Sequence, residues 1–352
     1  MAYTNIDDPS KYFQTTTFSS SGSAAAVTNG GNSNLQPDWV WSKGRSMGNS
    51  SHDIWDSSRG VNSTLFTSAN EAEDTSSNRI VSFNSDGFNY GTSGNHQTSG
   101  DYVAWQWKAN GGTTSSNSDG SITSTVQANT TAGFSIITYT GNGSASTIGH
   151  GLGVVPAMII VKCRNEATNW TVYHKNSNAT PQNYILELNN TNAAADNDRF
   201  NDTAPTSSVF SVNAGSSTVN KSSNTYVAYC FNSVQGYSEF GKYRGTGNAN
   251  GTFVYTGFKP AFVMIKSLSS ASWSLYDNKR LGYNPIDVWL RANGNDAEST
   301  SAISGDDIDL YSNGFKLRNS DNTINGYNTT YVYMAFAEHP FVTSKGAPTT
   351  AR

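Results

Sequence analysis

The chain has 352 residues and a formal net charge of -4, with 14% charged and 12% aromatic residues. This acidic balance, with lysine and arginine scattered along the chain, excludes a nucleic-acid partner, because binding to phosphate backbones needs a basic face. No apolar run approaches the roughly 20 residues that cross a bilayer, so we expect no membrane insertion. The N-terminus also lacks the charged and apolar regions of a signal peptide, which predicts synthesis and release in a cytoplasm.

The chain contains the same series of elements three times. Each series opens with a corresponding strand, which begins at Phe13, Phe134 and Phe240. Next comes a proline followed six residues later by a lysine, with a nearly unbroken apolar run between them. The three copies are "NLQPDWVWSK", "GVVPAMIIVK" and "GFKPAFVMIK". Because these runs are apolar on both faces, we expect central strands, with the proline at the edge of the run where its missing N–H does least harm.

A short aromatic strand follows each proline run and ends at Asp56, His174 and Asp277. After it come an apolar patch, a polar loop, a Phe-bearing strand and a closing strand. The closing strands are "YVAWQWKA", "YVAYCFNS" and "YVYMAFAE", which begin at Tyr102, Tyr226 and Tyr331. Because side chains alternate along a strand, Val103, Trp105 and Trp107 share one face, and we place this face in the core. Phe231 holds the position of Trp107 in the second copy.

Short strands, frequent turn signals and about 100 residues per repeat predict an all-β fold of three tandem antiparallel β-sandwiches, of jelly-roll or immunoglobulin size and with almost no helix. The predicted units are a first sandwich with an N-terminal arm, a Gly/Ser/Thr-rich linker, two further sandwiches and a C-terminal tail. Their bounds are 1–109, 110–132, 133–236, 237–341 and 342–352. The linker also alternates as a strand would, so a strand laid on a neighbouring sheet and a flexible tether are both open.

Several of these segments resemble a family of uncharacterised repeat proteins encoded by tailed, mostly marine, bacteriophages. They are "SDGSITSTVQANTTAGFSIITYTGNGSASTIGHGLGVVPAMIIVK", "DTAPTSSVFSV", "TYVAYCF", "GTFVYTGFKPAFVMIK" and "YVYMAFAEHPF". The resemblance implies a virion structural protein of the tail-fibre or appendage type, assembled in the host cytoplasm beside other virion proteins. It implies no catalytic residues.

The sequence carries no nucleotide, metallopeptidase or serine-hydrolase motif, and we expect neither an enzyme nor a cofactor. Asp306, Asp307 and Asp309 form the one weak candidate for a cation site, since hard cations prefer oxygen ligands. A solvated turn before a strand is the favoured interpretation of that acidic run. The two cysteines, Cys163 and Cys230, lie in or beside apolar runs and are expected to be buried thiols.

Trp39, Trp41, Trp105 and Trp107 are interpreted as core residues, because the other copies carry apolar residues at these positions. Ligand binding is expected in the loops that differ between copies, at 66–78, 189–204 and 278–300. The last loop holds the candidate ligand residues Arg280, Tyr283, Trp289 and Arg291, whose rings and guanidinium groups suit a polar ring-shaped ligand. The alternative for Trp289 is burial in a strand that continues the repeat.

Three functions remain open from the sequence. The leading one is a host-attachment adhesin that recognises a surface polysaccharide, a homo-oligomer with a trimer favoured, since several identical sites gain avidity. The second is a capsid decoration or head-fibre protein with a purely structural role. The third is a glycan depolymerase, which would need two carboxylates across a groove.

Overall fold

The computed structural model describes residues 2–300 and 307–349. In the first unit a larger sheet has the strand order β1-β8-β3-β4-β5, and a smaller sheet has the order β2-β7-β6. All neighbouring strands pair antiparallel. The strands are β1 (Phe13–Ser20), β2 (Ala25–Val27), β3 (Trp39–Gly44), β4 (His52–Asp56), β5 (Leu65–Phe66), β6 (Ile80–Asn84), β7 (Gly87–Tyr90) and β8 (Gly100–Trp107).

The second unit repeats this plan with a larger sheet ordered β16-β15-β14-β13-β18-β11-β10-β9 and a smaller sheet of β12 and β17. Its strands are β9 (Ser115–Asn117), β10 (Ser124–Asn129), β11 (Phe134–Thr140), β12 (Ser146–Gly149), β13 (Met158–Cys163), β14 (Thr171–His174), β15 (Tyr184–Glu187), β16 (Ala195–Asp196), β17 (Val209–Val212) and β18 (Thr225–Phe231).

The third unit has a larger sheet ordered β19-β27-β21-β22-β23-β24 and a smaller sheet ordered β20-β26-β25. Its strands are β19 (Ser238–Arg244), β20 (Phe253–Tyr255), β21 (Phe258–Ser267), β22 (Trp273–Asp277), β23 (Val288–Arg291), β24 (Ser299–Thr300), β25 (Ile308–Tyr311), β26 (Gly314–Leu317) and β27 (Thr330–Pro340).

Helical structure in the described residues is limited to short 3₁₀ turns, η1 (Pro9–Lys11), η2 (Gly94–Gln97), η3 (Pro181–Asn183) and η4 (Asp198–Phe200). The prediction of an all-β sandwich fold is therefore confirmed. None of the helical segments in this part of the chain is long and apolar enough to cross a membrane.

The proline-anchored strands β3, β13 and β21 lie inside the larger sheets, as predicted. Each pairs with the closing strand on one side and with the aromatic strand on the other. Pro37 and Pro156 precede their strands, while Pro260 lies within β21 at a shift of register opposite β27. In all three copies the missing N–H falls where the ladder is interrupted or has not begun.

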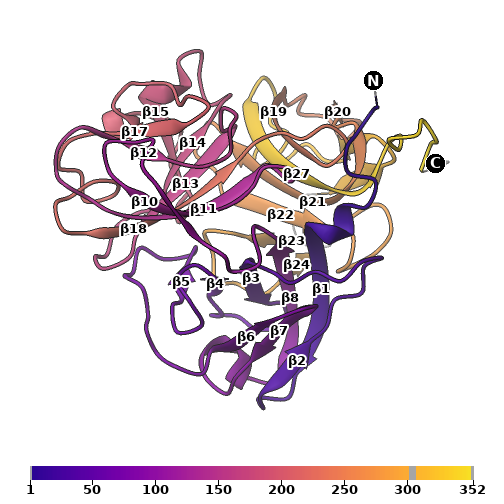
Figure 1. Cartoon of the computed structure of the whole chain (residues 1–352). Coiled ribbons are helices and arrows are strands. Elements are labelled where there is room, and N and C mark those ends of the chain that lie inside the picture. The colour runs from indigo at the N-terminus through magenta and orange to yellow at the C-terminus, as the bar shows by residue number, and fades with distance from the viewer. Residues whose placement is uncertain (1, 301–306, 350–352) are drawn as a thin grey trace.

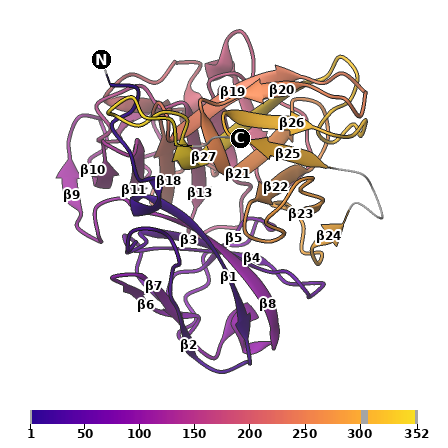
Figure 2. The ribbon, with the colours of Figure 1, turned by 90° about the vertical axis from the view of Figure 1, so that its right-hand side faces the viewer.

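The three sandwiches are not strung out along an axis but surround a common centre (Figures 1 and 2). One face of each larger sheet packs on the smaller sheet of its own unit. The opposite face packs on the other two units and contributes to one apolar cluster. The closing strands show this division: Val103, Trp105 and Trp107 join the central cluster, whereas Ala104 faces the first sandwich. The face that the sequence placed in the core therefore lies in a core shared by all three units.

Phe231 lies at the meeting point of the units. Its ring centroid is 4.8 Å from that of Phe134, 5.7 Å from Trp39 of the first unit, and 5.7 Å from Phe240 of the third. Aromatic pairs at these separations stabilise beyond the area they bury. The central core thus joins the three units through rings of each of them.

The contacts between units follow a cyclic order from first to second, second to third and third to first. The polar loop of each unit donates a backbone hydrogen bond to the residue two places after the lysine of the next. These bonds run from Glu73 to Arg164 at 2.6 Å, from Ala194 to Leu268 at 2.9 Å and from Glu298 to Arg45 at 2.7 Å. Because the same bond occurs at every contact, the three units are related by an approximate internal threefold symmetry.

The repeated lysines Lys43, Lys162 and Lys266 are fully buried beside these bonds. Each ammonium donates to a carbonyl of the preceding unit's loop, at Asn295 (3.4 Å), Asn70 (3.1 Å) and Thr191 (3.4 Å), as well as to carbonyls of its own unit. A buried lysine needs such acceptors because desolvation of the charge is costly. The lysine of the repeat therefore ties consecutive units together.

Residues 110–132, predicted as a linker, include β9 and β10, which extend the larger sheet of the second unit beyond β11. Of the two possibilities left open by the sequence, the structure has the strand. The described part of the tail folds back toward the N-terminal arm, where Ser344 donates to Asp7 through its backbone N–H and its hydroxyl, both at 2.6 Å. The two ends of the fold therefore meet at the contact between the third and first units.

Replacement of Phe231 by Ala should lower the free energy of unfolding by about 3–5 kcal/mol, because a large ring leaves a cavity in the packed centre. Since that centre belongs to all three units, chemical denaturation should show one cooperative transition at lower denaturant. The control is Phe253→Ala, which removes the same ring from a side chain that is 43% exposed. An unchanged midpoint for Phe231→Ala, or loss of the second unit alone, would contradict the shared core.

Stability should rise between pH 7.5 and pH 9. Burial lowers the pKa of Lys43, Lys162 and Lys266 to about 8 each, whereas the same groups in the unfolded chain titrate near 10.4. In this window the unfolded chain therefore binds more protons, so the free energy of unfolding increases with pH, on the order of 1 kcal/mol per lysine.

Urea denaturation at the two pH values measures this increase. Lys266→Met should remove about a third of this increase in the free energy of unfolding, since one of three equivalent groups is lost. Lys242→Met, at an exposed position of β19, should leave it unchanged. A stability that falls over this interval in the parent chain would show that the three lysines are not held in a desolvated state.

Candidate functional site

Three aromatic side chains stand on the outer face of the smaller sheet of the third unit. Phe253 and Tyr255 lie on β20 and are 43% and 57% exposed, and Tyr311 at the end of β25 is 37% exposed. The alternate residues Val254 and Leu310 point inward and are buried in the core of this sandwich. We call Phe253, Tyr255 and Tyr311 the aromatic platform.

The register of the sheet places these rings on two adjacent rows. Tyr255 and Tyr311 both pair with Gly314 of β26, and Phe253 and Asp309 both pair with Lys316. A Cβ at Gly314 would lie 2.1 Å from the carbonyl oxygen of Val254 and 3.0 Å from the edge of the Phe253 ring. Glycine is therefore required in the middle of the platform, and it leaves the rings on either side free of a blocking side chain. Phe253 and Tyr311 meet edge to face at 6.0 Å.

Hydrogen-bonding groups surround the rings. The Tyr311 hydroxyl donates to Oδ2 of Asp309 at 2.9 Å, and the same oxygen pairs with Arg318 at 3.3 Å. Partial burial, and then the neighbouring Asp309 carboxylate, raise the pKa of Tyr311 above its usual value. At the other end the hydroxyls of Tyr3 and Tyr255 lie 3.2 Å apart.

A hollow of about 430 Å³ adjoins the Tyr255 end of the platform. Its lining includes Tyr3, Glu239, Tyr255 and Tyr333. The site therefore combines flat rings, charged groups at its rim and a neighbouring depression. Rings of this kind stack on apolar ring faces of a ligand, while carboxylate, ammonium and hydroxyl groups fix its polar edges.

The equivalent surfaces of the other units lack these rings. Phe88 of the first unit corresponds to Phe315 of the third unit. Counted from these two positions in the sheet register, Ala26 lies where the third unit has Phe253, and Asn84 lies where it has Tyr311. The second unit has Thr147 at the Phe253 position, and its hydroxyl accepts a hydrogen bond from Ser121 N–H. The platform is thus specific to the third unit and is not part of the repeated packing plan.

Arg280, predicted as a ligand residue, is buried within the third unit. Its Nε donates to Oδ2 of Asp277 at 2.7 Å and its Nη1 pairs with Glu298 at 3.0 Å. Arg59 of the first unit makes the same pair with Asp56, three residues before it. The Arg280 guanidinium also lies over the ring of Trp105 of the first unit at 5.7 Å, so Arg280 belongs to the buried packing between these units.

Trp289 is also buried, on β23. This is the alternative to ligand contact that the sequence left open, namely burial in a strand that continues the repeat. The guanidinium of Arg291 lies over the Trp289 ring at 5.5 Å and bonds to the Ser274 hydroxyl. Arg291 thus belongs to the packing around Trp289 and not to the aromatic platform.

Tyr283 is the candidate that the structure leaves at the surface, with 68% exposure. The next residue, Asn284, is bonded in both directions to the backbone of Leu310, at 2.8 Å and 2.9 Å. Leu310 is the neighbour of Tyr311, so the loop that carries Tyr283 is joined through Asn284 to the strand that carries Tyr311. Of the four predicted ligand residues, this one remains available to extend the site.

The acidic run does not form a metal centre in the part that the structure describes. Asp306 lies outside the described residues. Asp309 is engaged by Tyr311 and Arg318, and burial raises the pKa of Asp307, with nearby Asp287 and Asp309 adding to the effect. Within residues 2–300 and 307–349, no three His, Cys, Asp or Glu side chains are placed to hold an ion.

The sequence analysis missed the platform residues themselves. The signal was present in "GTFVYTG", where Phe253 and Tyr255 alternate with an inward Val254, so both rings must face the same way. The sequence does not show which face of this strand is covered by other elements. An aromatic residue in a strand usually indicates burial, and only the sheet partners show that this face is open.

The described residues form an all-β protein of three sandwiches around a shared core, with an exposed aromatic platform on the third unit. Residues 8–340 match the family model described as a domain of unknown function (DUF7483), and the chain belongs to this family. No curated protein matches the chain.

Arg280→Ala should destabilise the protein by about 3–5 kcal/mol, because it leaves the buried carboxylate of Asp277 without its cationic partner. Urea denaturation measures this loss. Tyr283→Ala, three residues away at an exposed position, should change stability by less than about 0.5 kcal/mol. If Arg280→Ala unfolds at the denaturant concentration of the parent, the ion pair is not structural and Arg280 returns as a candidate ligand residue.

Proposed function

We propose that this protein is a virion structural protein of a tailed bacteriophage, an appendage adhesin that binds a glycan on the host surface. The observation that carries the binding activity is the aromatic platform of Phe253, Tyr255 and Tyr311 on the third unit. The assignment to a virion is supported by the resemblance of the repeated motifs to phage appendage proteins.

Exposure of three large rings in one patch favours a binding role. Isolated apolar side chains at a surface are normal, but a contiguous patch with a polar rim is typical of an interaction site. The first unit folds with Ala26 and Asn84 at two of the corresponding positions, so the sandwich does not require rings there. The rings of the third unit are therefore best explained by a ligand.

The chemistry of the patch favours a saccharide. Flat rings stack on the C–H faces of sugars, and Lys316 and Arg318 offer two cations to hydroxyl groups. Exposed rings on a sheet face suit a chain of sugars, and the hollow beside Tyr255 can take a branch or a neighbouring sugar. Binding of this kind is weak at one site, and a homotrimer would gain avidity by presenting three platforms together.

The test is binding to a microarray of bacterial surface polysaccharides with purified full-length protein. Tyr255→Ala and Tyr311→Ala should each weaken binding about fivefold to tenfold, since each removes one stacking ring worth on the order of 1 kcal/mol. Asn84→Ala, at the Tyr311 position of the first unit, is the matched control and should bind as the parent does. Each variant should retain the melting temperature of the parent, because the side chains are surface groups.

Two results would contradict the proposal. If the parent binds no saccharide on the array or on host cells, the adhesin role fails. If Asn84→Ala weakens binding as much as Tyr311→Ala, the site lies elsewhere. Electron microscopy of virions labelled with an antibody against the chain tests its location: labelled tail appendages support the proposal, whereas a labelled capsid shell supports the decoration role.

A further inference from the structure

The hollow beside Tyr255 lies where the aromatic platform meets the larger sheet of the third unit. Its lining brings together Tyr3 of the N-terminal arm, Glu239 of β19, Tyr255 of β20 and Tyr333 of β27. The Tyr3 hydroxyl donates to the Gly257 carbonyl at 2.8 Å, which fixes the arm at this place. Because Tyr255 belongs to both the platform and the hollow, a ligand that stacks on its ring lies next to the hollow.

Tyr333 brings a hydroxyl to this hollow from a ring that is itself buried. The residue is only 5% exposed, and its ring meets that of Phe315 edge to face at 5.3 Å. Burial, and then the nearby Glu239 carboxylate, raise the pKa of Tyr333, so the hydroxyl lies on the Glu239 side. Among the described residues this hydroxyl forms no hydrogen bond, although Tyr333 lines the hollow. It is therefore available to a ligand there.

The closing strands show that this hydroxyl is peculiar to the third unit. Two residues after their first tyrosine, they carry Ala104, Ala228 and Tyr333. The residues paired with these three are Thr16, Ile137 and Gly241. A Cβ at Gly241 would lie 2.4 Å from the Tyr333 hydroxyl oxygen, so the glycine makes room for it. A phenylalanine ring would fill the same space in the core, so the shared packing does not explain the hydroxyl.

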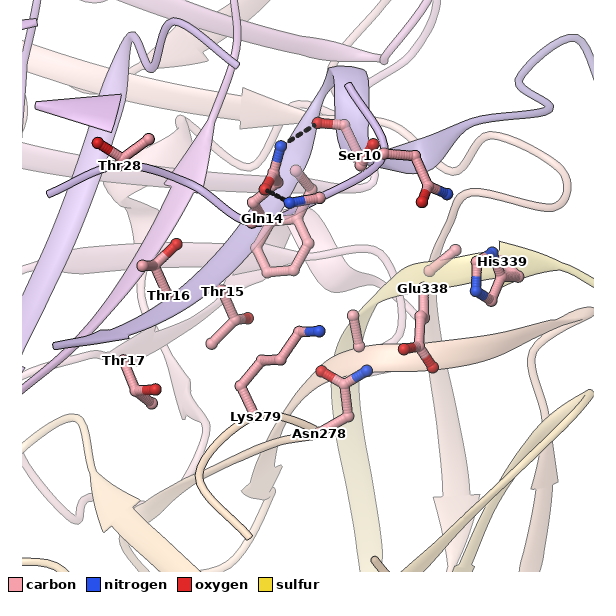
Figure 3. A pocket seen from close by; sticks show the side chains of 16 residues that line it. Ser10, Gln14, Thr15, Thr16, Thr17, Thr28, Asn278, Lys279, Glu338 and His339 are labelled. Carbon is pink, nitrogen blue, oxygen red and sulfur yellow. Dashed lines mark hydrogen bonds between the residues drawn. The ribbon is translucent and has the colours of Figure 1, made fainter. Parts of the chain in front are cut away.

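Glu239 also differs from its counterpart in the first unit. The sheet register places Gln14 at this position, and its amide is used within the fold. Its Nε2 donates to the carbonyls of Ser10 at 2.9 Å and Ser33 at 2.7 Å, and its Oε1 accepts from the Gly31 N–H at 2.8 Å. Figure 3, which looks into a cavity between the first and third units, shows the bond to Ser10.

The Glu239 carboxylate is bonded on one side only. Its Oε1 lies 3.4 Å from the ammonium of Lys175, and both side chains are about a third exposed, at 33% and 37%. Ion pairs as exposed as this one are weak. Oε2 of Glu239 has no hydrogen-bond partner in the part of the chain that the structure describes. This oxygen can accept a hydrogen bond from a ligand.

The charge of the lining restricts the class of ligand. Among the described residues that line the hollow, Glu239 is the one with a charged side chain, and the rest present hydroxyl, amide and backbone groups. A carboxylate repels the acid group of a uronate, whereas the hydroxyls of a neutral sugar can donate to it. The lining therefore favours a neutral sugar over an anionic one.

We propose that the hollow is a second sugar subsite, which binds a neutral hexose linked to the sugar that stacks on Tyr255. Hydroxyl groups of this hexose donate to Oε2 of Glu239 and bond to the Tyr333 hydroxyl. A volume of about 430 Å³ is at the lower end of ligand pockets, which suits one sugar ring. The inference rests on the proposed glycan-binding function and adds the class of sugar that the protein selects.

The experiment measures binding of the full-length protein to an array of purified bacterial polysaccharides, divided into neutral and uronate-containing ones. The parent should prefer neutral polysaccharides, and Tyr333→Phe should weaken their binding about fivefold because one hydrogen bond is lost. Glu239→Gln should weaken neutral binding about threefold, since a charge-assisted bond becomes a neutral one. The same variant should bind uronate-containing polysaccharides about threefold more tightly, because the repulsion is removed. Opposite changes for the two classes would not result from a damaged fold, and thermal melting checks that the fold is retained.

Two matched controls should bind as the parent does. Tyr327→Phe removes the hydroxyl of a tyrosine that is 81% exposed, and Glu166→Gln removes the charge from an exposed lysine pair of the second unit. If Tyr311→Ala weakens binding while Tyr333→Phe and Glu239→Gln do not, the hollow is not a subsite although the platform remains one. A parent that prefers uronate-containing polysaccharides also overturns the inference. A parent that binds no polysaccharide overturns both the subsite and the proposed function.

Discussion

The central apolar core holds the molecule together, and the rest of the structure depends on it. Each larger sheet is apolar on both faces, as in β13, where Met158 and Ile160 join the central cluster while Ile159 and Val161 face the sandwich. The smaller sheet of a unit covers only one of these faces. A single unit would expose the other face to water, at about 25 cal/mol per Å² of apolar surface. Three copies that turn these faces toward one another bury all of them, which explains why one chain carries the segment three times.

In a closed ring of three units, every contact between units has the same plan. Positions at which one copy differs from the other two can therefore be recognised. The loop-to-strand hydrogen bond at Glu73, Ala194 and Glu298 recurs without change, because each unit must meet the next in the same geometry. Where an exposed position of one copy departs from the plan, the packing that the copies share does not account for it. The aromatic platform is such a departure, and it belongs to the third unit. Functional surfaces in a repeat protein of this kind are found by comparison of its own copies.

The sequence predicted the elements better than their assembly. The positions of the central and closing strands followed from local signals, namely proline and a period of two, which act within a few residues. The shared core was not predictable in the same way. Alternation shows that Val103, Trp105 and Trp107 lie together, but a strand with two apolar faces does not reveal which face its own unit covers. Long-range partners decide this, and they also decided that Arg280 is buried: its Asp277 pair is visible in the sequence only as one of many nearby opposite charges.

The platform residues escaped prediction for a related reason. Phe253 and Tyr255 have the composition of a core strand, and in isolation burial is the better interpretation. The sheet order changes this interpretation, because β20 lies at the edge of a three-stranded sheet whose outer face has no second layer in the described structure. Ala26 and Asn84 show that the same face in the first unit is occupied by small or polar residues. Since the fold of the first unit places no demand for rings on this face, their presence in the third unit supports the binding role proposed for the platform.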